Sequence, residues 1–474
     1  MCQALAHGSI AMSDVDRAAR RYFRTMMRLG MFDPMDRQPM VTEIGPEQVD
    51  SPASRALAKR TAVQSIVLLK NDGGALPLDG VGGRLAASKV KFAFLGPHAN
   101  STQDLLSAPQ YHGANQLVDS HSPLMVAQAR GWDVTYAKGV NICDSRPPGY
   151  PNQPCGITAL RQHKQPPAPD TSGIAAAVVA AKAADVAVLF LGSDQTTEAE
   201  NFDRVSLGLV GAQEQLLREV TAVNKHVILV LIHGGPIDVS SAVQNPSVRA
   251  ILDAFQPGEL GADAILDLLT GVESPSALMP YTTYFQNFTR RDIREVDMRA
   301  GTGTTYWWMT DPVLFKFGYG MSFTTWDFRW ENGTPPQQQA LPVYAGSFGG
   351  VNHSVVVSNT GNRTSDVVAL AFVVRSALGG SPAEMPLRKL FGFERFSSVQ
   401  PGESRTAFFA STAESLGVVG LDGAKRLHPG RYRVEVGSVQ APAVHELELV
   451  GERSLLVEQN AWAQRLSHSA SASP

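Results

Sequence analysis

The densest group of residues suited to acid/base chemistry lies in the segment GSDQTTEAENFDR, residues 192–204. Its charged members are Asp194, Glu198, Glu200, Asp203 and Arg204. A carboxylic acid acts as a general acid at neutral pH when burial or a second carboxylate raises its pKa, and Arg204 is expected to keep Asp203 ionised. Glycoside hydrolysis needs such an acid and a second carboxylate facing it. On residue types alone, a solvated acidic loop is the simpler interpretation. The choice between this loop and a catalytic segment therefore depends on the rest of the sequence.

Other polar residues point less clearly to chemistry. His98, Asn100 and His233 follow predicted strands, but a hydrogen-bonded structural role is the more common one for such a histidine. His112 and His121 flank Asp119 without metal-ligand spacing, and we therefore predict no metal. The Gly-Gly turn after Ile232 lacks both a P-loop lysine and the spaced glycines of a dinucleotide site, so no cofactor is predicted.

The elements that must position these residues alternate between helix and strand from about residue 51 to 278. Continuous Val, Ile, Leu and Phe runs predict strands that are buried on both faces of a mainly parallel sheet, and amphipathic or Ala-rich stretches predict the helices between them. Predicted strands cover 90–95, the region of Val134, 186–191, 227–232 and 250–255, and predicted helices cover 53–64, 174–184, 211–223 and 259–269. Ligands of such sheets collect at the loops after the strands, and residues 192–204 form such a loop.

The two ends of the chain have a different character. A helix is predicted over 13–29, with an apolar stripe that has little to pack against in this sequence. After Pro312, short alternating strands separated by Gly- and Pro-rich turns predict a small β-sandwich without a convincing helix. Its predicted strands are 353–357, 367–374, 405–409 and 431–436.

Composition narrows the class of protein. The 474 residues carry a net charge of −3 and contain no basic cluster interleaved with aromatics, so we expect no nucleic-acid partner. No apolar run approaches the roughly 20 residues that cross a bilayer, and the first residues do not resemble a secretory signal. Cys143 and Cys155 are close enough in sequence to pair, with isolated thiols as the equal alternative. Five glycosylation sequons, at Asn100, Asn287, Asn332, Asn362 and Asn352, favour secretion.

Several motifs in order along the chain resemble glycoside hydrolase family three, of the plant and fungal β-xylosidase type. GSDQTTEAENFDR resembles the segment that holds the family's acid/base glutamate, and the first Glu of Glu-Ala-Glu, Glu198, matches that position. The motifs that support this are TAVQSIVLLKN (61–71), VLIHGGP (230–236), FQPG (255–258), FGYGMSF (317–323) and PLRKLFGFERF (386–396). In residues 275–280, PSALMP lacks the Gly and basic residue usual before the last proline. The resemblance covers about residues 8 to 450.

The resemblance implies four parts: a remnant of the last barrel helix with its linker (1–45), an α/β sandwich (46–325), a fibronectin type III-like domain (326–452) and a tail (453–474). It implies a retaining, exo-acting β-xylosidase or β-glucosidase whose catalytic residue in this chain is Glu198. The family's nucleophilic Asp lies on a barrel strand without a counterpart here, so we expect the isolated chain to be inactive.

The expected partner is a β-linked xylo- or gluco-oligosaccharide, and the expected location is extracellular or vacuolar. One alternative is a non-catalytic carbohydrate-binding or partner-docking remnant. Another is that Met1 is a misassigned start, with a barrel and a signal peptide upstream.

Overall fold

The computed structural model describes residues 2–48, 50–78, 90–106, 121–143, 168–194, 196–198, 204–331, 338–340, 350–377, 379–381, 384–420 and 422–457. The chain divides into two compact units, Met1–Ala58 and Lys59–Pro474. Helix α4, Pro52–Val63, contains the boundary between them.

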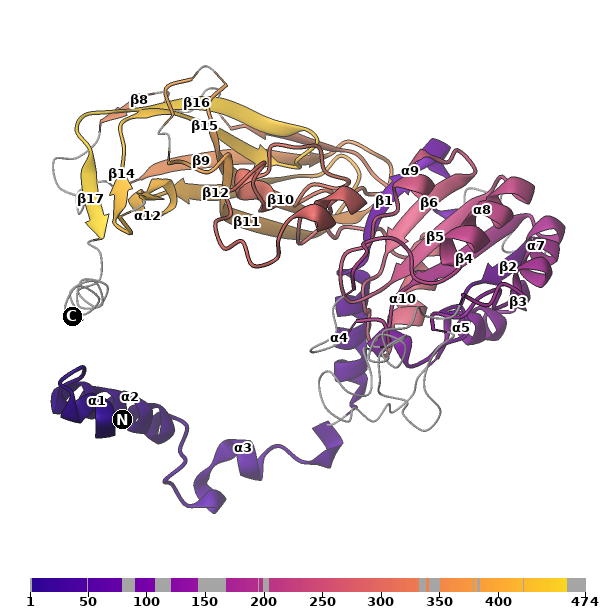
Figure 1. Cartoon of the computed structure of the whole chain (residues 1–474), viewed down its shortest axis with the longest axis horizontal. Coiled ribbons are helices and arrows are strands. Elements are labelled where there is room, and N and C mark those ends of the chain that lie inside the picture. Colours follow the sequence, from indigo (N-terminus) through magenta and orange to yellow (C-terminus); the bar gives the residue numbers. More distant parts are fainter. Residues whose placement is uncertain are drawn as a thin grey trace. The chain divides into compact units, whose positions relative to one another are not determined.

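The first unit consists of short helices and one longer helix (Figure 1). They are α1 (Cys2–Ala6), α2 (Met12–Arg28) and α3 (Pro39–Thr42), with 3₁₀ turns at Met35–Arg37 and Pro46–Gln48. The helix predicted over 13–29 is confirmed as α2, although Ala11 rather than Ser13 is its N-cap. The Asp14 carboxylate accepts a hydrogen bond from the Ala11 amide at 2.9 Å and so satisfies a free N–H group at the helix start.

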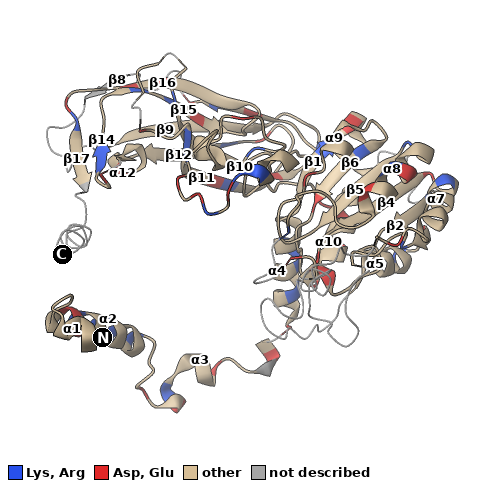
Figure 2. Cartoon of the chain, viewed as in Figure 1, with Lys and Arg blue, Asp and Glu red and all other residues tan. Residues whose placement is uncertain are grey.

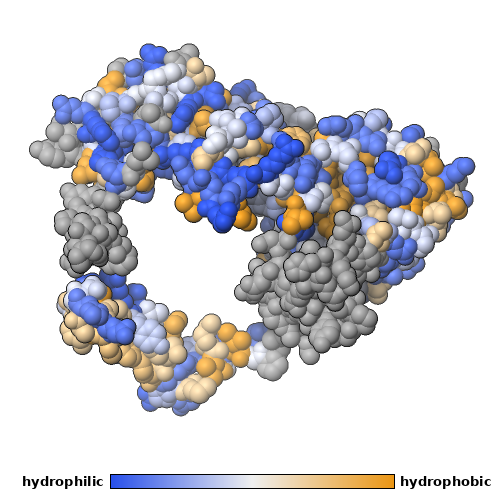
Figure 3. Space-filling model, in the orientation of Figure 1, coloured by the Kyte–Doolittle hydropathy of each residue, from blue (hydrophilic) through white to orange (hydrophobic). Residues whose placement is uncertain are grey.

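The apolar side chains of α2 are exposed. No residue of this helix is buried, and Tyr22 and Met27 are 62% and 66% exposed. Figure 3 shows the apolar colours of this unit on its surface. Since clustered exposed apolar groups mark contact surfaces, the stripe of α2 is suited to a partner.

A six-stranded sheet forms the centre of the α/β domain (Figure 1). Its order is β1 (Val67–Asn71), β6 (Val248–Asp253), β5 (Val227–Ile232), β4 (Val186–Gly192), β2 (Lys91–Leu95) and β3 (Asp133–Ala137). Five strands are parallel, and edge strand β1 runs antiparallel to β6. The predicted mainly parallel α/β sheet is therefore confirmed.

Two apolar layers cover the sheet, because alternate side chains of each strand point to opposite faces. Phe190 belongs to one layer with residues of α5 and α10, whereas Leu189 and Leu191 belong to the other with residues of α7 and α8. These helices span Pro123–Ala129 (α5), Gly261–Thr270 (α10), Ile174–Ala183 (α7) and Gln213–Val223 (α8), and a short α9 covers Ser240–Gln244. Burial on both faces explains the continuous apolar strands.

The domain closes where its first strand meets its last segment. Leu68 of β1 forms an isolated antiparallel bridge with Met321, whose amide donates to the Leu68 carbonyl at 2.9 Å. The Tyr319 hydroxyl donates to the Leu69 carbonyl at 3.1 Å. Short helices Gln286–Arg290 (η7) and Thr305–Trp308 (α11) lie in the segment between α10 and this closure.

The following domain is the predicted β-sandwich. Its sheets have the orders β11-β10-β15-β16-β8, β12-β9-β7 and β13-β14-β17. The strands are β7 (Trp326–Trp330), β8 (Gln338–Ala340), β9 (Val351–Asn359), β10 (Ser365–Arg375), β11 (Arg388–Val399), β12 (Ser404–Ser411), β13 (Val418–Val419), β14 (Lys425–Leu427), β15 (Gly430–Gly437), β16 (Pro442–Val450) and β17 (Ser454–Val457). Alternating side chains such as Val355 and Val357 fill the core between the sheets.

Two details of this domain differ from the prediction. A single helical turn, α12 (Ala413–Leu416), forms because the Thr412 hydroxyl accepts a hydrogen bond from the Ser415 amide at 3.3 Å. Strand β17 pairs with β14, so regular structure continues past the expected boundary at residue 452. The expected fraying from residue 461 lies outside the described residues.

The cysteines and the glycosylation sequons lie partly within the residues that the structure describes. Cys143 is disulfide-bonded and Cys2 is free, while Cys155 lies outside the described residues. Four sequon asparagines are exposed, namely Asn100, Asn287, Asn352 and Asn362, and Asn332 lies outside the described part. Among the described helices, none has the length and apolar character to cross a bilayer.

Candidate active site

The candidate site lies at the carboxyl ends of the parallel strands. From β2 the chain passes outward to β3 and then returns to β4 on the other side of β2. Ligands of open α/β sheets bind at such a reversal of strand order. The loops that follow β2 and β4 therefore border the position where a ligand is expected, and their described residues are 96–106, 193–194, 196–198 and 204 (Figure 1).

The end of β4 is fixed by a glycine and a glutamine. Gly192 has φ +151, and a Cβ atom at this position would overlap the Ile232 carbonyl of β5. The Gln213 side chain donates to the Gly192 carbonyl and accepts from its amide, both at 2.8 Å. Only glycine allows this close approach, which gives the loop a rigid start.

Asp194 organises the turn that precedes Glu198. Its carboxylate accepts a hydrogen bond from the Thr196 amide at 2.9 Å, and its carbonyl accepts from the amides of Thr197 and Glu198 at 3.1 and 3.2 Å. Burial, with a further contribution from the charge of Asp104, raises the pKa of the Asp194 carboxyl. The turn thereby directs the Glu198 side chain toward β5.

Glu198 is held by hydrogen-bond donors on both carboxylate oxygens. Its Oε1 accepts from the Ser193 hydroxyl at 2.5 Å and from the amides of Gly234 and Gly235 at 3.1 and 2.9 Å. Its Oε2 lies 2.6 Å from Nε of Arg204. Burial alone would raise the pKa of Glu198, but the Ser193 hydrogen bond and the Arg204 charge outweigh it and lower the pKa below its usual value.

Arg204 does more than neutralise this carboxylate. Its Nη2 donates to the Pro236 carbonyl at 2.8 Å, so one guanidinium joins the loop after β4 to the turn after β5. The sequence predicted Asp203 as its partner. Within the described residues the partner is Glu198, and Asp203, like Glu200, lies outside the part of the chain that the structure describes.

The Gly-Gly pair after β5 is required by this arrangement. A Cβ at Gly235 would lie 2.8 Å from Oε2 of Glu198, and one at Gly234 would lie 3.1 Å from Oε1. Any side chain at position 235 would push the carboxylate away from the amide. The HGGP motif thus forms the anion-binding turn for Glu198.

The two strand-end histidines are buried beside carboxylates, as expected for structural histidines. His98 Nδ1 lies 3.0 Å from Asp104, and His233 Nε2 lies 2.9 Å from Asp253. Burial would lower the pKa of His233, but the Asp253 charge outweighs it and raises that pKa. Within the described residues no group of three His, Cys, Asp or Glu side chains is arranged to hold a metal ion. His112 and Asp119 lie outside them.

The sequence did not indicate Ser193, Asp104 or Asp253 as parts of this cluster. Asp253 ends β6, and Phe255, which follows it, has φ +49, in the left-handed region that such a residue seldom adopts. Only their positions in the sequence could have indicated them. Ser193 directly follows β4, Asp253 ends β6, and Asp104 lies in the loop after β2.

Comparison with known proteins identifies the families of the two domains. Residues 66–323 match the glycosyl hydrolase family 3 C-terminal domain, and residues 368–440 match a fibronectin type III-like domain. The probable exo-1,4-beta-xylosidase bxlB of Aspergillus fumigatus is 33% identical over 96% of this chain and 55% of its own length. The probable exo-1,4-beta-xylosidase xlnD of Neosartorya fischeri is 33% identical over 93% of this chain and 54% of its own.

Solved structures give the same result. A GH3 exo-beta-xylosidase (XlnD) in complex with a xylobiose aziridine probe has a TM-score of 0.77 at 26% identity and covers 97% of this chain and 56% of its own. The GH3 beta-glucosidase of Bifidobacterium adolescentis shares the fold, with a TM-score of 0.68, 24% identity and coverage of 94% of this chain and 59% of its own. The chain spans about half the length of these relatives. Since one family domain matches more than half of the sequence, the chain belongs to glycosyl hydrolase family 3.

Proposed function

We propose that this chain is the carboxy-terminal portion of an exo-acting, retaining β-xylosidase that removes a β-linked xylose from a xylo-oligosaccharide. The observation that carries the proposal is the rigid start of the loop after β4, which holds Glu198 at the ligand edge of the sheet. The relatives named exo-1,4-beta-xylosidases support xylose, and the beta-glucosidase neighbours make glucose the alternative sugar.

A retaining reaction needs two carboxyl groups about 5–5.5 Å apart across the scissile bond. One attacks the anomeric carbon, while the other protonates the departing oxygen and later takes a proton from water. The loop after β4 supplies the second group. The resemblance to the family assigns the nucleophile to a barrel aspartate.

The role of Glu198 follows from its contacts. The prediction assigned it the acid/base function, which requires a proton on the carboxyl group in the resting enzyme. The lowered pKa and the four donors favour a carboxylate that stays ionised, and a bound Arg204 blocks Oε2 from a substrate. We therefore propose that Glu198 positions the loop and that Glu200, two residues further on and outside the described residues, is the acid/base.

A second candidate is a non-catalytic, carbohydrate-binding or partner-docking protein. It is favoured by the exposed apolar side chains of α2, which are suited to contact with a partner. An extracellular or vacuolar location is proposed for either candidate, with the disulfide at Cys143 and the exposed sequons as support.

The experiment that separates the two candidates is reconstitution with a barrel. A related family 3 barrel fused upstream of residue 11 should give hydrolysis of aryl β-xylosides that requires the Glu-Ala-Glu segment. A well-folded fusion that binds xylobiose but shows no turnover would favour the non-catalytic candidate.

A further inference from the structure

A groove of about 930 Å³ lies far along the chain from the loop after β4, where residues 296–308 face the β-sandwich. Trp307 and Trp308 line one side, and Phe391 of β11 and Thr412 line the other. The Leu387 amide donates to the Trp307 carbonyl at 2.7 Å and joins the two sides. Ligand sites favour such junctions between domains, where aromatic side chains and polar groups converge.

The tryptophan side of the groove is held in a strained conformation. Thr305, the first residue of α11, has φ +57, a left-handed conformation that is strained for a β-branched residue. The Tyr284 hydroxyl accepts a hydrogen bond from the Thr305 amide at 2.7 Å, and the Thr305 hydroxyl accepts one from the Trp307 amide at 3.2 Å. The strain is therefore compensated by contacts that fix the tryptophans.

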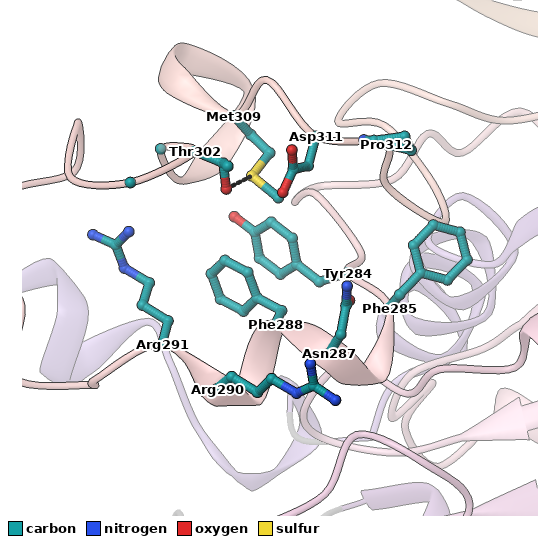
Figure 4. A pocket seen from close by; sticks show the side chains of 12 residues that line it. Tyr284, Phe285, Asn287, Phe288, Arg290, Arg291, Thr302, Met309, Asp311 and Pro312 are labelled. Carbon is teal, nitrogen blue, oxygen red and sulfur yellow. Dashed lines mark hydrogen bonds between the residues drawn. The ribbon is translucent and has the colours of Figure 1, made fainter.

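Tyr284, which accepts the hydrogen bond from Thr305, lines a neighbouring pocket of about 590 Å³ (Figure 4). Tyr284 and Phe288 stack there with ring centroids 3.7 Å apart and an interplanar angle of 5°. Thr302 contacts Met309 on the opposite side of that pocket. Because the Tyr284 ring is immobilised by the stack, its hydroxyl is a fixed anchor for Thr305.

The charge of the groove is balanced. Its charged lining residues are Asp297, Glu384 and Glu414 against Arg299, Lys389 and Lys425. Lys425 is ion-paired with Glu414, and Arg299 lies 4.6 Å from the centre of the Trp308 ring. Burial, followed by the charge of Lys425, lowers the pKa of Lys389 to about 8. Basic and acidic residues are likewise interspersed over this domain in Figure 2.

This lining selects against charged ligands and for neutral ones. A polyanion would meet three carboxylates, and a polycation would meet three basic groups. A sugar chain instead presents apolar ring faces to aromatic side chains and hydroxyls to donors and acceptors of both kinds. We propose that this groove is an accessory binding site for a neutral β-linked oligosaccharide, separate from the loop that carries Glu198. The choice of xylose as the sugar rests on the proposed function.

The test is calorimetric titration of the full 474-residue chain with xylotetraose, cellotetraose and tetragalacturonate. Trp307→Ala removes the aromatic surface and should weaken binding of the neutral ligand about tenfold. Ala410→Arg places a bulky charged group on an exposed lining position and should abolish binding without disturbing the core. Tyr136→Ala removes an exposed aromatic from strand β3 and should leave the affinity unchanged. Circular dichroism checks that each variant is folded.

Binding of either neutral tetraose that both groove variants weaken supports the site. Binding of cellotetraose without xylotetraose would support the groove but contradict xylose as the sugar of the proposed function. The inference is overturned if neither neutral ligand binds, if tetragalacturonate binds more tightly than both, or if Ala410→Arg retains the parental affinity.

Discussion

Oε2 of Glu198 lies 2.6 Å from Nε of Arg204, and the two side chains are 21% and 10% exposed. Both residues lie in the loop after β4. The hydrogen bonds of Glu198 with the Gly234 and Gly235 amides and of Arg204 with the Pro236 carbonyl join this loop to the turn after the adjacent strand β5. Because the partners of the ion pair are largely shielded from water, the pair should matter more than the surface pairs elsewhere in the chain.

Arg204→Ala should lower the free energy of unfolding by about 2–3 kcal/mol, because it leaves the Glu198 carboxylate buried without its counter-charge. Urea denaturation followed by fluorescence measures the change. Arg294→Ala breaks an exposed pair with Asp292 and serves as the control, which should show no measurable effect. Equal effects of the two substitutions would contradict the role given to Arg204.

The stability that Glu198 contributes should depend on pH. Its pKa is lower in the folded chain than its ordinary value of 4.5, so the unfolded chain takes up the proton first as the pH falls. The contribution is therefore complete above pH 4.5 and is lost as the pH falls through the depressed pKa. The difference in unfolding free energy between the parent and Glu198→Gln should therefore shrink as the pH falls below about 4.5.

Glu214→Gln is the matched control for this titration, because Glu214 is an exposed carboxylate on α8. It should leave the pH profile of stability unchanged. A Glu198→Gln effect that grows as the pH falls would show that this carboxyl is protonated in the folded state, as an acid/base residue would be.

In the barrel fusion, the two glutamates should behave differently. Glu200→Ala should slow substrates with poor leaving groups much more than activated aryl glycosides, and added azide should restore deglycosylation, because azide replaces the activated water. Glu198→Ala should slow all leaving groups to a similar extent, without azide rescue, because it displaces the loop. Leaving-group dependence and azide rescue in Glu198→Ala alone would restore the original assignment.

The isolated chain should show no retaining glycosidase activity, because one carboxylate can protonate a leaving group but cannot form the glycosyl-enzyme intermediate as well. Purified protein is assayed with aryl β-xylosides and aryl β-glucosides. Turnover well above background that Glu200→Gln removes would mean that this chain supplies its own nucleophile.

The first unit should be the site of earliest proteolysis. None of the residues of α2 is buried, and Tyr22 and Phe23 are exposed. Limited trypsin digestion should therefore cleave before about residue 45 while the α/β domain stays intact. Protection of Tyr22 and Phe23 in hydrogen exchange would argue against an exposed helix.

The elements whose side chains become buried on folding could be predicted from the sequence. The runs at 186–191 and 227–232 contain no polar residue, and a strand covered on both faces is the arrangement that buries such a run completely. The periodicity of α2 was equally clear. The one-turn helix α12 was missed because a single hydroxyl cap, at Thr412, decides it.

The sequence predicts a location for the site, but it does not predict the contacts of the site residues. Position after a strand predicted that residues 192–204 face a ligand, since the strand ends of a parallel sheet lie at one edge. Which carboxylate Arg204 binds depends on how the turn at Asp194 and the amides of Gly234 and Gly235 converge in space. Contacts between residues 36 and 37 positions apart leave no periodic signal in a single sequence.

The bridge between Leu68 and Met321 brings the first strand and the last segment of the α/β domain together. A domain whose ends lie close together can be inserted into another protein with little strain. Its two ends can also be joined while new ends are created at another position. The proximity of these two segments therefore makes a circular permutation of the α/β domain, with new ends in an exposed loop, compatible with its fold.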